Sequence, residues 1–380
     1  MTAKPGLAEV LRTYGPTYLA NHTLSVAQAT AWRAIIACRT AALGGQLEAC
    51  TRCGSCRYVY HSCRNRHCPQ CQTRAKEAWL AARQRELLPV PYFHLVFTLP
   101  HVLNGVASRH PKLIYAQLFR AAASTLTAFA GNPRWLGGQP AFTLVLHTWQ
   151  QNLGRHLHVH ALVAGGALTT DGQWRTPTRG FLFPVKALSK VFRGRFMNGL
   201  EQTLTERDSA EWRQVKALCY QHEWVVYAKQ PLGGPAQVLD YLGRYTHRVA
   251  LSNERIVAID QGEVALRVRV NGTSGKRRIL RLPGSEFIQR FLTHVLPKGF
   301  KRIRHYGLLG PAHKTAQLAA ARTALQAPAP QAAVVESVAA FLHRVARLEW
   351  LCCPVCRAGQ MRVIEILPAR ASRPPLRGPP

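Results

Sequence analysis

The sequence predicts an α+β fold, in which an antiparallel sheet with helices follows a small cysteine-rich domain. Short apolar strands, among them residues 92–99 and 141–147, alternate with longer stretches of helical spacing. Residues 155–166 alternate histidine with apolar residues and then run apolar to a Gly-Gly turn, which is typical of a strand. Seven of the eleven cysteines precede residue 72, which indicates a site rather than a background frequency.

The elements are expected in the following order. Residues 8–45 have helical spacing, and Thr23 or Ser25 is suited to cap the second helix there. Residues 73–88 are expected to form a basic amphipathic helix, and further helices are expected over 111–130, 185–218 and near 285–296. Additional strands are expected over 224–228, 255–259 and 264–270, with turns at 231–235 and at Asn271-Gly272. The order of strands suggests an antiparallel sheet with helices on one face.

The cysteine-rich stretch contains two Cys-x-x-Cys knuckles about 15 residues apart, a spacing typical of a tetrahedral structural zinc site. The four first-choice ligands are Cys50, Cys53, Cys68 and Cys71. Cys63 and His67 could each replace one of them, and Cys56 and His61 are weaker candidates. Near the C-terminus, Cys353-Pro354-Val355-Cys356 is half of such a site. It either binds metal with residues from elsewhere or is a bare turn.

The chain is strongly basic, with 50 Lys and Arg against 18 Asp and Glu and a formal net charge of +32. So large an excess predicts a polyanionic partner, most simply nucleic acid. Basic residues expected to contact it flank the cysteines, line a helix over 238–249 and mix with aromatic residues over 297–307: Arg64, Arg66, Arg244, Arg248, Lys298, Lys301, Arg302 and Arg304.

The chain lacks the features of membrane and secreted proteins. No apolar run approaches the roughly 20 residues of a membrane helix. Residues 1–6 lack the apolar segment of a secretion signal. We therefore expect a cytoplasmic protein associated with the bacterial nucleoid.

Alternation places His156, His158 and His160 on one sheet face, with neighbouring side chains roughly 7 Å apart along the strand. Two such imidazoles can converge on one divalent ion, magnesium or manganese. His156 is a candidate third ligand, and Gln151 or Asn152 could serve instead. The alternative is that these histidines only face solvent or satisfy backbone groups.

Tyr241 and Tyr245 stand four residues apart on the expected helix over 238–249, so both hydroxyls lie on one face. Aromatic pairs at this spacing usually belong to a core, but Arg244, His247 and Arg248 on the same helix would be rejected by one. A metal-bound phosphate would be open to attack by a tyrosine, which would form a 5′-phosphotyrosine and free a 3′-hydroxyl.

The chain resembles rolling-circle transposases of the insertion-sequence ninety-one type, which belong to the HUH (His-hydrophobe-His) endonuclease superfamily. The likeness covers residues 18–310, although Leu157 stands where many relatives have proline. It rests on five segments in the right order: His61 to Pro69, Phe93 to Pro100, His156 to His160, Tyr241 to Arg248 and His294 to Phe300.

The resemblance implies an antiparallel-sheet HUH endonuclease core in which His158 and His160 bind the metal. It also implies that Tyr241 and Tyr245 cut single-stranded DNA at the element's ends, although some relatives use one tyrosine. We expect a helical and zinc-binding domain over 1–90 and the catalytic domain over 91–310. A linker, a short helix near 333–349, the Cys-x-x-Cys and a disordered basic tail are expected over 311–380.

Two other functions fit part of the sequence. A zinc-containing DNA-binding protein without catalysis, such as a degenerate transposase or repressor, would explain the charge and the cysteines. An RNA-processing metallonuclease would use the histidines but not the tyrosines. The joint presence of the histidine strand and the tyrosine pair favours the transposase.

Overall fold

The structure is a computed structural model of the chain. It describes residues 5–178, 180–205, 207–232, 237–238, 243, 250–270, 276–330, 337, 340, 343 and 351–370. Within these residues no helix combines the length and apolar character that crossing a membrane would require.

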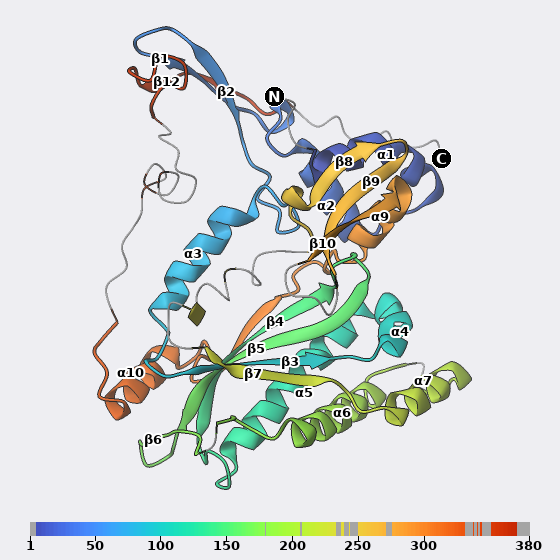
Figure 1. Cartoon of the computed structure of the whole chain (residues 1–380), viewed down its shortest axis with the longest axis vertical. Coiled ribbons are helices and arrows are strands. Elements are labelled where there is room, and N and C mark those ends of the chain that lie inside the picture. Colours follow the sequence, from blue (N-terminus) through green and yellow to red (C-terminus); the bar gives the residue numbers. More distant parts are fainter. Residues whose placement is uncertain are drawn as a thin grey trace.

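A six-stranded antiparallel sheet forms the centre of the molecule (Figure 1). Its strands follow the order β11-β4-β5-β3-β7, and β6 pairs with the end of β5. The strand bounds are β3 Tyr92–Thr98, β4 Gln139–Trp149, β5 Arg155–Leu168, β6 Trp174–Arg175, β7 Val226–Leu232 and β11 Ile303–Gly307. The predicted α+β class with an antiparallel sheet is confirmed.

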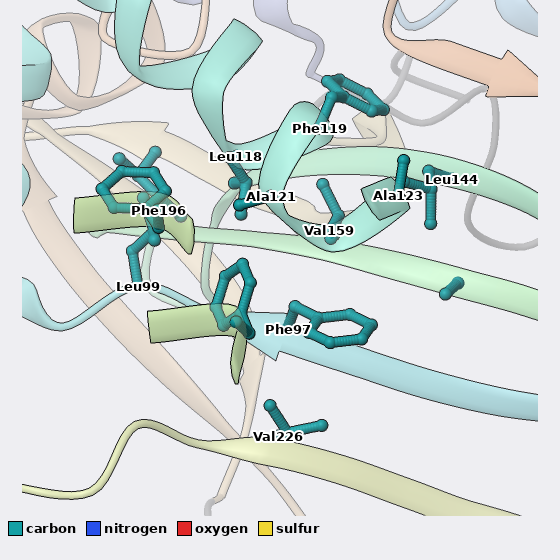
Figure 2. Packing of buried hydrophobic residues seen from close by; sticks show 14 of the residues in the cluster. Phe97, Leu99, Leu118, Phe119, Ala121, Ala123, Leu144, Val159, Phe196 and Val226 are labelled. Carbon is teal, nitrogen blue, oxygen red and sulfur yellow. The ribbon is translucent and has the colours of Figure 1, made fainter. Parts of the chain in front are cut away.

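One face of this sheet packs against α5 (Pro111–Gly131) and α6 (Val185–Glu201) around the largest apolar core. Figure 2 shows Phe97 and Val159 on the strands, with Phe119 of α5 and Phe196 of α6 in the same cluster. Because side chains alternate along a strand, Leu157 and Val159 enter this core and the histidines of β5 face the other way. Shorter helices flank this layer: η2 His101–Leu103, α4 Asn104–Arg109 and α7 Ala210–Gln221.

The histidine face carries helices as well, so the expectation of helices on one face only is wrong. A smaller apolar cluster there joins Leu162 and Ala164 of β5 to Leu318 of α10 (Lys314–Ala324). Trp79 and Leu80 of α3 (Gln72–Gln84) pack against the same cluster. The sheet is therefore a middle layer, and its histidine strand lies under partial cover.

A second body combines the N-terminal helices with residues 250–292 (Figure 1). It contains α1 Leu7–Asn21, α2 Val26–Ala37, η3 Asn253–Arg255, β8 Ile256–Asp260, β9 Glu263–Arg269, β10 Arg277–Pro283 and α9 Gly284–Leu292. Leu7 and Leu11 share its core with Phe287 and Phe291. Ser25 caps α2 through a capping box with Gln28, as one of the two expected caps.

A third unit is a three-stranded antiparallel sheet of order β12-β1-β2. It joins β1 Gly45–Cys50 and β2 Cys56–Tyr60, after η1 Ala41–Leu43, to β12 Met361–Leu367. Figure 1 shows it projecting away from the central sheet. The packing therefore combines segments across the expected boundaries at residues 90 and 310.

The expected turn at Gly165-Gly166 is wrong, because β5 continues through both glycines to Leu168. A Cβ on Gly165 would lie 2.7 Å from the Pro91 carbonyl oxygen, and one on Gly166 would lie 2.6 Å from Trp174 Cε2. These residues are glycine because neighbouring chain passes close by, rather than because the strand ends.

Candidate metal centres and nucleic-acid interface

Three histidines gather on the open face of β4 and β5. The ligand-capable nitrogens of His147, His158 and His160 all lie within 4.8 Å of one another. Nε2 of His158 and Nε2 of His160 are 3.1 Å apart. His147 comes from β4, where it stands directly opposite His158 in the antiparallel register. The three imidazoles thus converge from two strands on one point.

The hydrogen bonds around this cluster orient the rings. Nδ1 of His158 lies 3.0 Å from the carbonyl oxygen of His156, which can only accept, so Nδ1 carries the proton and Nε2 a lone pair. Nδ1 of His160 lies 2.9 Å from Nε2 of His94 on β3. When His160 donates this bond, its Nε2 also presents a lone pair toward His158. The lone pairs on Nε2 of His158 and Nε2 of His160 then point to one place. The separation of these two atoms is that of two nitrogens bound to the same cation.

Burial keeps the imidazoles of His158 and His160 neutral. The pKa of His158 is lowered to about 3, by burial first and then by the neighbouring His156. The pKa of His160 is lowered well below its ordinary value by burial and by His147 and His158. A metal ligand must be unprotonated, so the cluster is suited to bind a cation at physiological pH.

Of the three alternatives offered for the third ligand, none lies in this cluster. His156 is half-buried and its Nδ1 lies 3.3 Å from Nε2 of His101. The side-chain oxygen of Asn152 accepts from the Gly154 amide, and Gln151 precedes it in the same turn. His147 was missed as a ligand, although it ends the predicted strand over 141–147. The antiparallel order of that strand and the histidine strand was the signal that could have found it.

The ring of His147 stacks on Trp149 at a centroid distance of 4.3 Å. The guanidinium of Arg302 lies 5.8 Å from the same indole. Arg302 is only 9% exposed, and burial lowers its pKa to about 9. It therefore lies inside the protein, behind the histidine cluster, and not on the surface as its predicted DNA contact would require.

Tyr241, Tyr245, Arg244 and Arg248 lie outside the described residues. Two described residues of the same stretch are buried. Val238 joins the cluster on the histidine face with Leu162. Gly243 lies against α3, where an added Cβ would be 3.1 Å from Leu80 Cδ1.

The cysteines form two clusters instead of one. In the first, Cys38, Cys63, Cys68 and Cys71 bring their sulfurs within 4.8 Å of one another. Cys38 ends α2 and Cys71 precedes α3, so the cluster joins two helices. Its sulfurs pack into the core of the second body, and hydrogen bonds from Cys63 and Cys68 lower the pKa of the Cys71 thiol.

The second cluster brings Cys50 and Cys53 together with Cys353 and Cys356. The sulfurs of Cys50 and Cys356 are 3.7 Å apart, as are those of Cys53 and Cys353. The half site predicted near the C-terminus thus meets the first knuckle, with 300 residues between Cys53 and Cys353.

The expectation that Cys50, Cys53, Cys68 and Cys71 share one site is therefore wrong. The hairpin of β1 and β2 carries the first knuckle away from the second, so each pair finds other partners. His67 is no part of either cluster, because its Nε2 accepts from the Leu296 amide and its Nδ1 lies beside Asn65. Cys56 and His61 are exposed. Cys38 was missed, since no second cysteine stands near it in sequence.

Two of the exposed cations predicted to bind DNA, Arg66 and Lys298, lie around a cleft of about 1000 Å³ between α2, α5 and the loop after α9. Arg66, Arg155 and Lys298 line it together with Tyr115, and none of its described lining residues is acidic. Arg66 donates to the carbonyl oxygens of Pro297 and Phe300, which ties the cysteine module to that loop.

Three further predicted contacts differ in exposure. Arg64 and Lys301 are exposed. Arg304 is half-buried and stacks over Phe119 and Phe300 at 4.3 and 5.0 Å from the ring centroids. Its guanidinium contributes to packing, so the surface available to a phosphate is provided by the other two.

Two family models match the chain. Residues 141–317 match the model described as "Putative transposase", and residues 10–99 match the model described as "Transposase zinc-binding domain". A Sinorhizobium fredii protein with the first of these descriptions is 44% identical over 95% of this chain and 95% of its own length. The transposase of an insertion sequence element from Pseudomonas savastanoi pv. phaseolicola is 26% identical over 72% of this chain and 68% of its own.

Among solved structures, the conjugative relaxase TrwC in complex with its oriT DNA matches 62% of this chain and 72% of its own at 14% identity. A second structure of that relaxase, with a mutant oriT DNA, matches 60% of this chain. The TM-scores are 0.24 and 0.23.

Proposed function

The chain belongs to the transposase family of the insertion-sequence ninety-one type, and on that premise we propose that it cuts and rejoins single-stranded DNA through a metal-assisted tyrosine. A transposase of this type acts on DNA, which accounts for the net charge of +32. The single-stranded substrate, the metal and the tyrosine are the parts that we propose.

The observation that carries the proposal is the convergence of His147, His158 and His160 from β4 and β5. Three imidazoles converging from rigid strands suit a divalent ion, magnesium or manganese, of which manganese accepts nitrogen ligands more readily. When bound there, the ion would polarise a phosphate and stabilise charge that develops on it. His94 would hold the proton on Nδ1 of His160 and so keep its Nε2 directed at the ion.

Tyr241 and Tyr245 are the proposed nucleophiles. The phenol oxygen of one tyrosine would bond to phosphorus as the bond from phosphorus to the 3′ oxygen breaks. The phenol proton would leave to solvent or a nearby base, and the departing 3′ oxygen would take up a proton to give a 3′-hydroxyl. Rejoining reverses these steps with a new 3′-hydroxyl, so no nucleotide hydrolysis is needed. The burial of Val238 and Gly243 on the histidine face supports this role.

The cleft beside α2 is the proposed path of the single strand, because three cations line it and none of its described lining residues is acidic. The cluster of Cys38, Cys63, Cys68 and Cys71 is the proposed zinc site of this domain, since four thiolates are a structural zinc set. A zinc ion there would fix the module that carries Arg64 and Arg66 against the catalytic sheet.

The test is a covalent adduct assay with purified protein, Mn²⁺ or Mg²⁺, and a single-stranded oligonucleotide that carries the element's end. We expect a protein–DNA band on a denaturing gel that is lost in the Tyr241→Phe, Tyr245→Phe double variant. Tyr220→Phe on α7 is the matched control, because Tyr220 is an exposed tyrosine stacked on Arg193. An adduct that survives the double change would disprove the tyrosine chemistry. DNA binding without any adduct would favour a binding protein instead.

A further inference from the structure

We propose that a second zinc ion binds between Cys50, Cys53, Cys353 and Cys356, and that it holds the C-terminal strand β12 on the N-terminal hairpin. The matched zinc-binding family model ends at residue 99, so half of this ligand set lies outside it. The ion would join two chain segments that the catalytic sheet separates in sequence. Zinc binding by these four cysteines depends neither on DNA cleavage nor on the histidine cluster.

The spacing of the sulfurs fits a tetrahedral ion. With zinc–sulfur bonds of about 2.3 Å, two thiolates on a tetrahedron lie about 3.8 Å apart. Two pairs of sulfurs face each other across the knuckles, Cys50 with Cys356 and Cys53 with Cys353, and each pair is separated by 3.7 Å. Sulfurs in a disulfide lie only about 2.05 Å apart, so these pairs have the spacing of shared ligands and not of oxidised partners.

Backbone amides around the cluster are aimed at the sulfurs. The amides of Arg52 and Cys53 donate to Sγ of Cys50, at 3.4 and 3.5 Å. The amide of Gly359 donates to Sγ of Cys356 at 3.4 Å. Such donors stabilise negative charge on sulfur, which is the form that binds metal. Each half of the cluster therefore contains a cysteine sulfur that accepts hydrogen bonds from backbone amides of its own knuckle.

The two halves also share a backbone shape. The residue after the second cysteine of each knuckle has a left-handed conformation, with φ of 70° at Gly54 and 54° at Arg357. This turns each chain back so that both sulfurs of a knuckle point inward. At Gly359 a side chain is excluded, because its Cβ would clash with Sγ of Cys50.

The two knuckles lie at the end of the β12-β1-β2 sheet, whose apolar interior is small. Its apolar interior consists of Cys50, Cys353 and Met361, with Cys356 against them. Most of β12 is exposed, including Ile364 and Ile366. So small a unit cannot bury enough apolar surface to be stable and needs a staple such as a metal. The burial of Cys50 and Cys353 in this unit is thus better explained by zinc binding than by apolar packing alone.

The first experiment measures zinc per chain in the full-length protein by mass spectrometry of the metal. We expect two equivalents in the wild type, one for each cluster, and one equivalent in the Cys353→Ser, Cys356→Ser double variant. The Cys50→Ser, Cys53→Ser double variant should lose the same single equivalent, and combining all four changes should lose no more. Cys352→Ser is the matched control, since Cys352 donates to the Arg357 carbonyl outside the cluster.

A second experiment needs no substitution and so does not depend on how variants fold. The wild-type protein is treated with a thiol-alkylating reagent before and after a chelator, and the labelled cysteines are mapped. We expect Cys53, which is exposed, and Cys356 to be protected at first and to become reactive together as one zinc equivalent is released. Cys56, also exposed, should react from the start.

The inference would be overturned by one zinc equivalent in the wild type, by two equivalents retained in the Cys353→Ser, Cys356→Ser variant, or by alkylation of Cys356 without loss of metal. Intramolecular disulfides between the four cysteines in freshly purified protein would overturn it as well. Because these readouts use no DNA, they stand whether or not the tyrosine adduct forms.

Discussion

His147 lies directly opposite His158 in the antiparallel pairing of β4 and β5, and their rings are 5.3 Å apart in an edge-to-face arrangement. This cross-strand pair completes the histidine cluster with His160, a residue two positions along the same strand. The proposed third ligand thus comes from the neighbouring strand and not from the histidine next along β5.

His147→Ala should therefore reduce metal-dependent cleavage as strongly as His158→Ala. Loss of a ligand should exceed the roughly 10- to 100-fold effect typical of losing a residue behind a ligand. His156→Ala is the matched control, because it removes a histidine of the same face outside the cluster. The measurement is the adduct yield across a manganese titration. Equal losses in His147→Ala and His156→Ala would contradict the assignment.

His94→Gln should weaken metal binding without abolishing cleavage. The imidazole of His94 lies 2.9 Å from Nδ1 of His160 and would fix the proton there. We expect the apparent manganese affinity to fall about 10- to 100-fold, with activity recovered at high metal concentration. A loss that no metal concentration restores would argue against a role behind the ligand.

Cys38→Ser should release the zinc of the first cluster and destabilise the second body. Cys38 is buried at the end of α2, and its sulfur lies 3.4 Å from that of Cys71 within that body's core. Structural zinc contributes directly to folding free energy, so we expect a lower unfolding midpoint together with loss of one zinc equivalent. Cys56→Ser, which changes an exposed cysteine, should retain both zinc content and midpoint.

His294 should make the protein less stable as the pH falls. It is fully buried between Thr148 and the Leu153 carbonyl, and burial lowers its pKa from 6.5 to about 4. Between these values the unfolded chain binds a proton that the folded protein does not, so stability is retained above pH 6.5 and lost as the pH falls toward 4.

The expected loss from this residue between pH 6.5 and pH 5 is about 2 kcal/mol. Urea unfolding of the wild type and of His294→Gln at these two values measures it. The pH dependence should be smaller in the variant by about that amount, whereas His222→Gln, which changes an exposed histidine, should match the wild type. His305, whose pKa burial also lowers to about 4, contributes to the remaining slope, as do His67 and His158, whose pKa values burial lowers to about 3.

Lys298→Ala should weaken binding of single-stranded DNA in a salt-dependent manner. Lys298 is exposed on the wall of the cleft beside Arg66 and Arg155. Removing one phosphate contact should lower the slope of log affinity against log salt by about 0.7 for a single strand. Fluorescence anisotropy at several salt concentrations measures this, with Lys190→Ala on exposed α6 surface as control. An unchanged slope would exclude Lys298 from the strand's path.

Local patterns predicted most elements, and contacts between distant segments account for what was missed. The histidine strand and the Ser25 cap follow from spacing within a few residues, and the structure confirms both. In sequence, the two glycines in β5 are typical of a turn. The reason for them is the close approach of Pro91 and Trp174, which are placed there only by the tertiary structure.

The cysteine and histidine clusters likewise combine features that are visible in local sequence with contacts that are not. The spacing of Cys50 and Cys53 predicts a knuckle. No residue near them in sequence indicates that they cluster with Cys353 and Cys356. Cys38 and His147 each stand alone in sequence and become ligand candidates only when a helix or strand places them. Burial of Arg302 behind Trp149 likewise depends on how β11 pairs with β4, while its surroundings in sequence are basic and polar.

The pairing of β1 with β12 also sets an order of events during synthesis. Cys53 leaves the ribosome 300 residues before Cys353, so the N-terminal hairpin must wait as an unpartnered two-stranded ribbon while the whole catalytic sheet is made. Such a ribbon is at best marginally stable alone. A chain interrupted by a premature stop or frameshift before residue 353 would never close this sheet, so its completion distinguishes a finished copy of the protein from a truncated one.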